Sequence, residues 1–147
     1  MYGETDPRGV VTLLEALDEE FKLFTMSGGC FWDLGSGIGK IVFSVALSNF
    51  SFNLYGGVEF LNQLHETAFE TYVSEWNGRG GEGVVQSLPR HKQHIKLQFE
   101  NGDLFDLKNT WIEGYCSYYY HFMTYCLLIF SGLHWCYSVI VCSSPSI

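Results

Sequence analysis

An acidic residue followed by a run of glycines is the feature of this sequence most suited to chemistry. The run Asp33-Leu-Gly35-Ser36-Gly37-Ile-Gly39-Lys40 stands between a short apolar segment, residues 30–32, and a segment rich in Ile, Val and Ala, residues 40–47. If these segments are a strand and a helix, the run lies at the carboxyl end of a strand, where open α/β sheets bind ligands. Glycines lack the Cβ that would keep a ligand from the backbone, and the first turn of a helix offers unpaired N–H groups. We therefore expect a ligand at this turn.

The spacing of the glycines separates three classes of cofactor loop. A nucleoside-triphosphate loop requires Gly-x-x-x-x-Gly-Lys-Ser/Thr, but the interval from Gly35 to Gly39 is too short and Ile41 stands where the metal-binding hydroxyl is needed. A dinucleotide loop requires Gly-x-Gly-x-x-Gly, whereas the glycines here are spaced Gly-x-Gly-x-Gly. The first class is excluded and the second is weakened, which favours a nucleoside without phosphates.

Two further acids follow predicted strands. Glu59 ends the predicted strand 52–58, and a carboxylate there can accept hydrogen bonds from both hydroxyls of a ribose. Asp103 follows the predicted strand 95–100 and can accept a hydrogen bond from an adenine amino group. Together with Asp33 they would repel a phosphate but would suit a cationic sulfonium. The alternative is that each acid only caps a following helix or turn.

The elements that must position these residues alternate along the chain. Apolar residues recur at three- and four-residue steps from Gly9 to Phe24, which predicts an amphipathic helix with Pro7 just before it. Further helices are expected over 40–47 and 60–76, and a loop over the glycine-rich residues 78–83. Helices that alternate with the three predicted strands indicate an α/β fold with a parallel sheet.

Four segments together resemble a known family, the Dot-one (disruptor of telomeric silencing) histone lysine methyltransferases. The segments are Tyr2-Gly3-Glu4-Thr5 before the first helix, the run Asp33 to Lys40, Gly57-Val58-Glu59, and Gly102-Asp103-Leu104. Their order and spacing agree with the family across roughly residues 2 to 111. The glycine motif alone indicates only the broad methyltransferase class, and Tyr-Gly-Glu-Thr upstream narrows it to this family.

The resemblance implies a Rossmann-like class I methyltransferase fold, of which this chain would hold the first three or four strands, and S-adenosylmethionine as the cofactor. It also implies transfer of a methyl group to a lysine of a nucleosomal histone in the nucleus, without a metal and without an assigned catalytic residue. The alternatives are another Rossmann-like methyltransferase and a cofactor-binding remnant without turnover. The resemblance implies these cofactor-binding residues: Tyr2, Gly3, Glu4, Thr5, Asp33, Gly35, Ser36, Gly37, Gly39, Lys40, Glu59, Asp103 and Leu104.

The carboxyl-terminal part of the chain departs from the family. We expect a cofactor-binding part over residues 1–112 and a separate tail over 113–147, because no Asp, Glu, Lys or Arg occurs from Tyr115 to the end. The segment 138–144 is a candidate for a fourth strand, but serines stand where the family has an asparagine-rich motif of the substrate channel. The tail is also consistent with a membrane helix over 122–142, interrupted by polar residues, or with a mispredicted exon.

Composition limits the partners. Sixteen acidic and 8 basic residues give a formal charge of −8, so a surface that binds nucleic acid mainly by neutralising phosphates is not expected, and neither is sequence-specific DNA binding. The segment 90–96 is a local basic strip, and an ordinary solvated loop is the favoured interpretation of it. The 5 cysteines form no Cys-x-x-Cys pair, so neither a zinc site nor a disulfide framework is expected, and Cys30 is expected to be a buried thiol.

Overall fold

The protein is described here from a computed structural model of the whole chain. The structure describes residues 6–21, 30–78, 83–103, 124–131 and 135–142. In chain order its principal elements are α1 (Pro7–Phe21), β1 (Cys30–Leu34), α2 (Lys40–Leu47), β2 (Leu54–Glu59), α3 (Asn62–Thr71), the π-helix η1 (Tyr72–Trp76), α4 (Val84–Ser87), the 3-10 helix η2 (Arg90–Lys92), β3 (Lys96–Asn101), β4 (Thr124–Ser131) and β5 (Trp135–Cys142).

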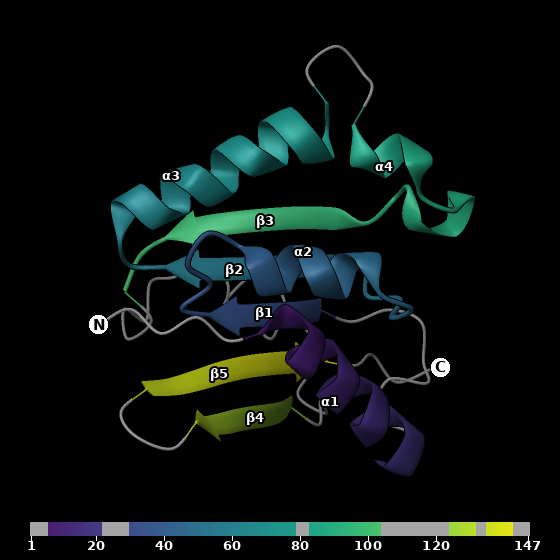
Figure 1. The fold of residues 1–147 in the computed structure, drawn as a ribbon, viewed down its shortest axis with the longest axis vertical. Coiled ribbons are helices and arrows are strands. Elements are labelled where there is room, and N and C mark those ends of the chain that lie inside the picture. Colours follow the sequence, from purple (N-terminus) through teal and green to yellow (C-terminus); the bar gives the residue numbers. More distant parts are fainter. Residues whose placement is uncertain (1–5, 22–29, 79–82, 104–123, 132–134, 143–147) are drawn as a thin grey trace.

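The strands form one mixed sheet in the order β3-β2-β1-β5-β4 (Figure 1). β1 pairs in parallel with β2, and β2 pairs in parallel with β3, so Asp33 lies opposite Gly57 and Glu59 opposite Asn101. The order β3-β2-β1 with helical crossovers is the first half of a Rossmann-like sheet. The expected α/β fold with a parallel sheet is therefore confirmed over these three strands.

Beyond β1 the sheet differs from a Rossmann-like order. β5 pairs with β1, at the place where the fourth parallel strand is usual, but it runs antiparallel to β1 and is joined to β4 as an antiparallel pair. Residues 138–142 of the candidate strand 138–144 therefore belong to β5. In the candidate membrane helix 122–142, the described residues 124–131 and 135–142 form strands instead. No helix among the described residues is long and apolar enough to cross a membrane.

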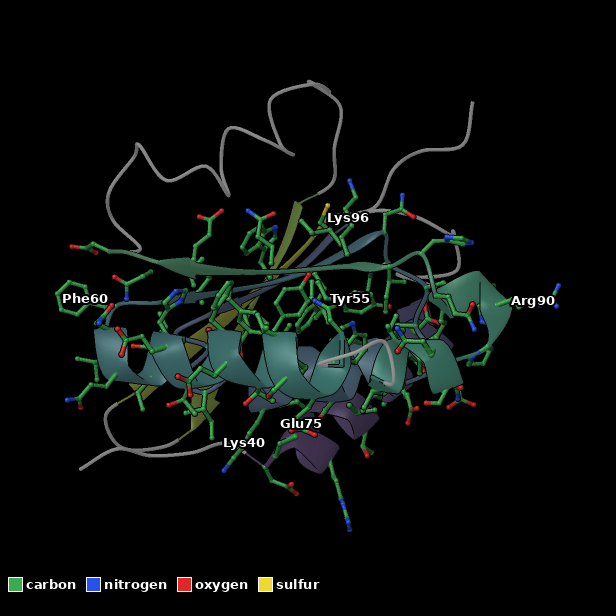
Figure 2. The ribbon with its side chains drawn as sticks, turned by 90° about the horizontal axis from the view of Figure 1, so that it is seen from above. Lys40, Tyr55, Phe60, Glu75, Arg90 and Lys96 are labelled. Atoms are coloured by element: carbon green, nitrogen blue, oxygen red, sulfur yellow. The ribbon has the colours of Figure 1, made fainter. Side chains whose placement is uncertain are left out.

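Helices α1, α2 and α3 lie on one face of the sheet (Figures 1 and 2). β1 is buried along its whole length, and its side chains point alternately to the two faces of the sheet. Phe31 packs in the core under the helices, whereas Trp32 belongs to a second cluster on the other face. By the same alternation Asp33 and Glu59 lie on the helical face. The expected burial of the Cys30 side chain is confirmed, at 7% exposed.

Several element boundaries differ from the expected ones; β1 extends to Leu34 rather than residue 32, and β3 is Lys96–Asn101 rather than 95–100. α1 begins at Pro7 rather than Gly9, because Asp6 accepts the N–H of Arg8 at 3.2 Å and Pro7 has no N–H to satisfy at a helix start. β2 begins at Leu54 rather than at residue 52. The Tyr55 hydroxyl, which accepts the N–H of Phe52 at 3.1 Å and donates to Phe50 O at 2.8 Å, holds the preceding segment in a turn. The expected helix 60–76 is α3 followed by η1.

Candidate functional site

The glycine run forms a tight turn between β1 and α2, as its spacing predicts. Gly35, Gly37 and Gly39 all have positive φ, at 89°, 55° and 82°, which residues with a Cβ adopt at a cost. The turn folds over the end of β2, because the N–H groups of Gly35 and Ser36 donate to Val58 O at 2.8 and 3.0 Å. The turn is therefore fixed to the carboxyl edge of the sheet before any ligand arrives.

The Glu59 carboxylate joins this turn to the start of α3. Its Oε2 accepts the N–H of Gly37 at 2.8 Å, and its Oε1 accepts the N–H of Leu61 at 2.8 Å. The side chain is only 7% exposed. The alternative that this acid caps a following turn is therefore part of its role. Each carboxylate oxygen has two acceptor positions, so these two bonds leave capacity for the ribose hydroxyls, and the ribose role remains a prediction.

The N–H groups of the glycine run before α2 are used within the chain, whereas the expectation of unpaired N–H groups concerned the first turn of α2, which begins at Lys40. Gly35, Ser36 and Gly37 donate as described above, and Gly39 N donates to Ser36 O at 2.8 Å. These donors are used within the chain because the turn must pack against β2 and close onto α2. What the turn offers at Gly35 is space: a Cβ built there meets no atom within 4 Å.

Asp33 is a buried carboxylate without a hydrogen-bond partner among the described residues. Its side chain is 1% exposed, and neither Oδ1 nor Oδ2 is hydrogen-bonded. Burial, and to a smaller extent the charge of Glu59, raises the pKa of the Asp33 carboxyl to about 7. A cation placed at this turn would offset both effects.

The remaining predicted site residues are placed as follows. Asp103 is exposed and lies two positions beyond the end of β3, and Glu59 O accepts the N–H of Gly102 at 3.1 Å, so the ends of β2 and β3 are joined. Asp33, Glu59 and Asp103 thus belong to one edge of the sheet, as expected. Lys40 is the exposed first residue of α2 and its side chain points outward (Figure 2). Tyr2, Gly3, Glu4, Thr5 and Leu104 lie outside the described residues.

The interpretation of the basic strip as a solvated loop is wrong for its central residue. Lys92 is 5% exposed, and its Nζ donates to Ala46 O at 3.1 Å and to Ser48 O. Burial lowers the pKa of this ammonium group. Lys92 therefore holds the end of α2, while a hollow of about 460 Å³ beside it is lined in part by His91, His94 and Lys96.

The sequence analysis did not identify two residues that the structure makes notable, Lys92 and Phe60. Lys92 gave no local signal, because its acceptors lie more than forty positions earlier. Phe60 did give one: a large aromatic residue directly after the last residue of a predicted strand, and it is 67% exposed. A search for apolar residues that follow predicted ligand residues would have found it.

Comparison with known proteins relates the chain to one protein family. The model of the family described as "Histone methylation protein DOT1" matches residues 1–79, more than half of the chain and the whole of the glycine turn and Glu59. A structure of a Methanococcus maripaludis protein, described as an S-adenosyl-L-methionine-dependent methyltransferase, aligns with a TM-score of 0.35 and 17% identity. The alignment covers 70% of this chain and 46% of that protein. A comparison with curated proteins gives no match.

Proposed function

The chain belongs to the DOT1 histone methylation family, and from this membership we propose that it binds S-adenosylmethionine and serves in methyl transfer to a lysine of a nucleosomal histone, in the nucleus. The observation that supports S-adenosylmethionine as the cofactor is the pair of buried carboxylates, Asp33 and Glu59, at the glycine turn. Two such anions disfavour a phosphate and favour a ligand with positive charge. S-adenosylmethionine has a sulfonium, an ammonium and a ribose, and it has no phosphate.

Different residues at this edge of the sheet would bind different parts of this cofactor. Glu59 would accept the ribose hydroxyls with the acceptor capacity that its two backbone bonds leave. Asp33 would provide the negative charge that stabilises the cationic end, and Gly35 would leave room for it. Asp103 would accept from the adenine amino group at the end of β3.

S-adenosylmethionine, when bound, would supply an activated methyl group, which an in-line attack by a neutral lysine amine would transfer from sulfur to nitrogen, with S-adenosylhomocysteine as the leaving group. The lysine ammonium would first lose a proton to solvent water, because only the neutral form has a lone pair. The protein's part is orientation, which contributes roughly 7 to 11 kcal/mol to lowering such a barrier. A nucleophilic side chain is not needed for this step.

A second candidate function is cofactor binding without turnover. It is favoured by β5, which runs antiparallel to β1 where the family continues with a strand that helps to form the substrate channel. A third candidate, methyl transfer to a small molecule or to RNA, shares the same cofactor site.

Two measurements separate these candidates. Calorimetry with S-adenosylmethionine tests the cofactor, and we expect binding that the Glu59→Ala variant weakens at least about tenfold, since it removes charge-assisted hydrogen bonds. Radiolabelled methyl transfer to recombinant nucleosomes tests turnover. Binding without transfer would support the second candidate, and absence of binding by the folded wild-type protein would contradict all three.

A further inference from the structure

A hollow at the amino edge of β2 and β3 concentrates basic side chains. Its volume is about 460 Å³, which is the size of a small-molecule pocket, and it lies at the end of the parallel strands opposite to the glycine turn. None of the described residues that line it is an Asp or a Glu, although the whole chain has 16 acidic and 8 basic residues. The hollow is therefore locally positive in an acidic protein.

Four side chains with N–H donors line this hollow: His91, Lys92, His94 and Lys96. His91, His94 and Lys96 are exposed, so they are accessible to a ligand. An imidazole donates an N–H in either protonation state, and an ammonium group has three N–H donors. Lys92 is buried, and its two acceptors are backbone carbonyls, which satisfy hydrogen bonds without bringing a negative charge. Its positive charge therefore adds to the attraction for an anion.

The backbone that carries these donors is held in place. Lys92 N donates to Pro89 O at 2.7 Å, and Ile95 N donates to Lys92 O at 3.3 Å. Lys96 N donates to Asn53 O at 3.1 Å, which joins the basic segment to the residues before β2. The hollow is thus organised without a ligand, which lowers the entropy lost when one binds.

The remaining wall of the hollow is partly apolar, because Phe52, Leu54 and Ile95 also line it. A ligand that contacts both parts of the wall has an anionic group and an organic group. The oxygens of a phosphate are arranged tetrahedrally, so they can accept hydrogen bonds from donors on different elements. A planar carboxylate instead matches a flat fork of donors such as a guanidinium. The wall therefore favours a phosphate that carries an organic substituent.

We propose that this hollow binds a phosphate ester, with the phosphate at His91, His94 and Lys96 and the organic group against the apolar wall. The inference does not rest on the proposed function, since the hollow and the glycine turn lie at opposite edges of the sheet. The two imidazoles are not assigned to a metal, because no group of three His, Cys, Asp or Glu among the described residues could hold one. The ester can be a small molecule or the backbone of a nucleic acid.

NMR titration of the isotope-labelled full chain tests the proposal with three probes: phenyl phosphate, benzoate and a short DNA duplex. Phenyl phosphate should shift the amide signals of residues 90–96 and should bind more tightly than benzoate, which joins the same ring to a carboxylate. Lys96→Gln should bind phenyl phosphate about threefold more weakly, the effect of one exposed ion pair. The triple variant His91→Gln/His94→Gln/Lys96→Gln should bind it about tenfold or more weakly.

Arg90→Gln is the matched control for Lys96→Gln. It removes one positive charge from the same basic segment, but Arg90 does not line the hollow. Figure 2 shows the side chains of Arg90 and Lys96 projecting from different sides of the molecule. The affinity of Arg90→Gln for phenyl phosphate should therefore stay close to that of the wild type. All the substituted residues are exposed, so the variants should keep the wild-type unfolding midpoint.

The DNA duplex distinguishes the two sources of the ester. Displacement of phenyl phosphate by the duplex would assign the site to a nucleic-acid backbone, and its absence would assign the site to a small ester. Equal affinities for phenyl phosphate and benzoate, equal losses in Arg90→Gln and Lys96→Gln, or unshifted signals at residues 90–96 would each overturn the proposal. The triple variant should bind S-adenosylmethionine like the wild type, so failure of this site and failure of the proposed function give different results.

Discussion

At the amino edge of the parallel strands the buried ammonium of Lys92 donates to two backbone carbonyls, whereas at the carboxyl edge the buried carboxylate of Asp33 has no hydrogen-bond partner among the described residues. Both groups are ionisable and nearly inaccessible to water. Removing such a charge from water is costly unless a partner compensates for it. Lys92 is compensated within the chain, whereas no residue in the described part of the chain donates a hydrogen bond to Asp33.

The two edges also differ in how the backbone is used. At the amino edge Lys92 satisfies carbonyls at the end of α2, which would otherwise lack intrahelical donors. At the carboxyl edge most N–H groups of the glycine turn donate within the chain, so the backbone of the turn is held by hydrogen bonds. The Asp33 carboxylate accepts none from the described residues. An organised turn around a carboxylate that no described residue compensates is the arrangement that the proposed cationic cofactor would require, whereas the charge of Lys92 serves the structure.

The largest expected effect comes from neutralising Asp33. The folded protein binds the Asp33 proton more tightly than the unfolded chain does, so the stability that this group contributes falls as pH rises from about 4 to about 7. Above that range the ionised form costs the folded state about 4 kcal/mol. Asp33→Asn should therefore raise the free energy of unfolding at pH 8 by up to that amount, and should change it little near pH 4.

The same variant should bind S-adenosylmethionine at least about tenfold more weakly, because the counter-charge is lost. Urea unfolding at both pH values and calorimetry at pH 8 measure the two effects. Glu70→Gln, which neutralises an exposed carboxylate on α3, is the control and should change neither. A variant Asp33→Asn that is less stable than the wild type at pH 8 would show that the carboxylate has a partner and would remove the contrast with Lys92.

The second effect tests the amino edge. Lys92→Met keeps the length and apolar stem of the side chain but removes the donor to Ala46 O and Ser48 O. The free energy of unfolding should fall by about 2 to 3 kcal/mol, the range for hydrogen bonds to a charged group. Affinity for S-adenosylmethionine in the folded variant should stay unchanged, because the two edges are separated by the length of the strands.

Lys96→Met is the matched control for this variant. Lys96 is exposed on β3 and its replacement should cost less than about 0.5 kcal/mol. Equal losses in the two variants would mean that the carbonyls at the end of α2 are satisfied by water once Lys92 is removed. A loss of cofactor affinity in Lys92→Met would mean that the edges are coupled.

The sequence predicted the elements whose signal is local. The bounds of α2, Lys40–Leu47, were predicted correctly because an apolar run follows a glycine turn, and the three parallel strands follow from short buried segments between helices. The carboxyl edge was predicted for the same reason, since its acids stand directly after the strands. Whether those acids bind the cofactor remains a prediction.

Features that depend on distant partners could not be predicted. The antiparallel pairing of β5 with β1 joins segments more than a hundred residues apart, and an uncharged aromatic stretch specifies neither partner nor direction. The burial of Lys92 depends on carbonyls at the end of α2, and a run of basic residues gives no sign that one of them turns inward. That no described residue donates a hydrogen bond to Asp33 likewise follows from packing rather than from its place in the glycine motif.

The last effect concerns the space at the glycine turn, and it compares two glycines of the same turn. A Cβ at Gly35 meets no atom within 4 Å, whereas a Cβ at Gly39 would lie 2.8 Å from Phe99 Cε1 and 3.0 Å from Phe43 Cε2. Both residues have positive φ, so an alanine at either position strains the backbone by about 1 to 2 kcal/mol. Gly39→Ala adds overpacking of about 1 to 3 kcal/mol and should be the less stable variant.

Affinity should follow the opposite order. In Gly35→Ala the added methyl enters the open space where the cofactor is expected, so binding should weaken about tenfold or more while unfolding shifts only by the backbone strain. In Gly39→Ala the methyl points into the core, so the folded fraction should bind nearly as well as the wild type. Urea unfolding of both proteins measures the order of stability, and calorimetry with S-adenosylmethionine measures the order of affinity. If Gly35→Ala loses stability but no affinity, the open space at the turn is not occupied by the ligand, and Asp33 must be compensated from another side.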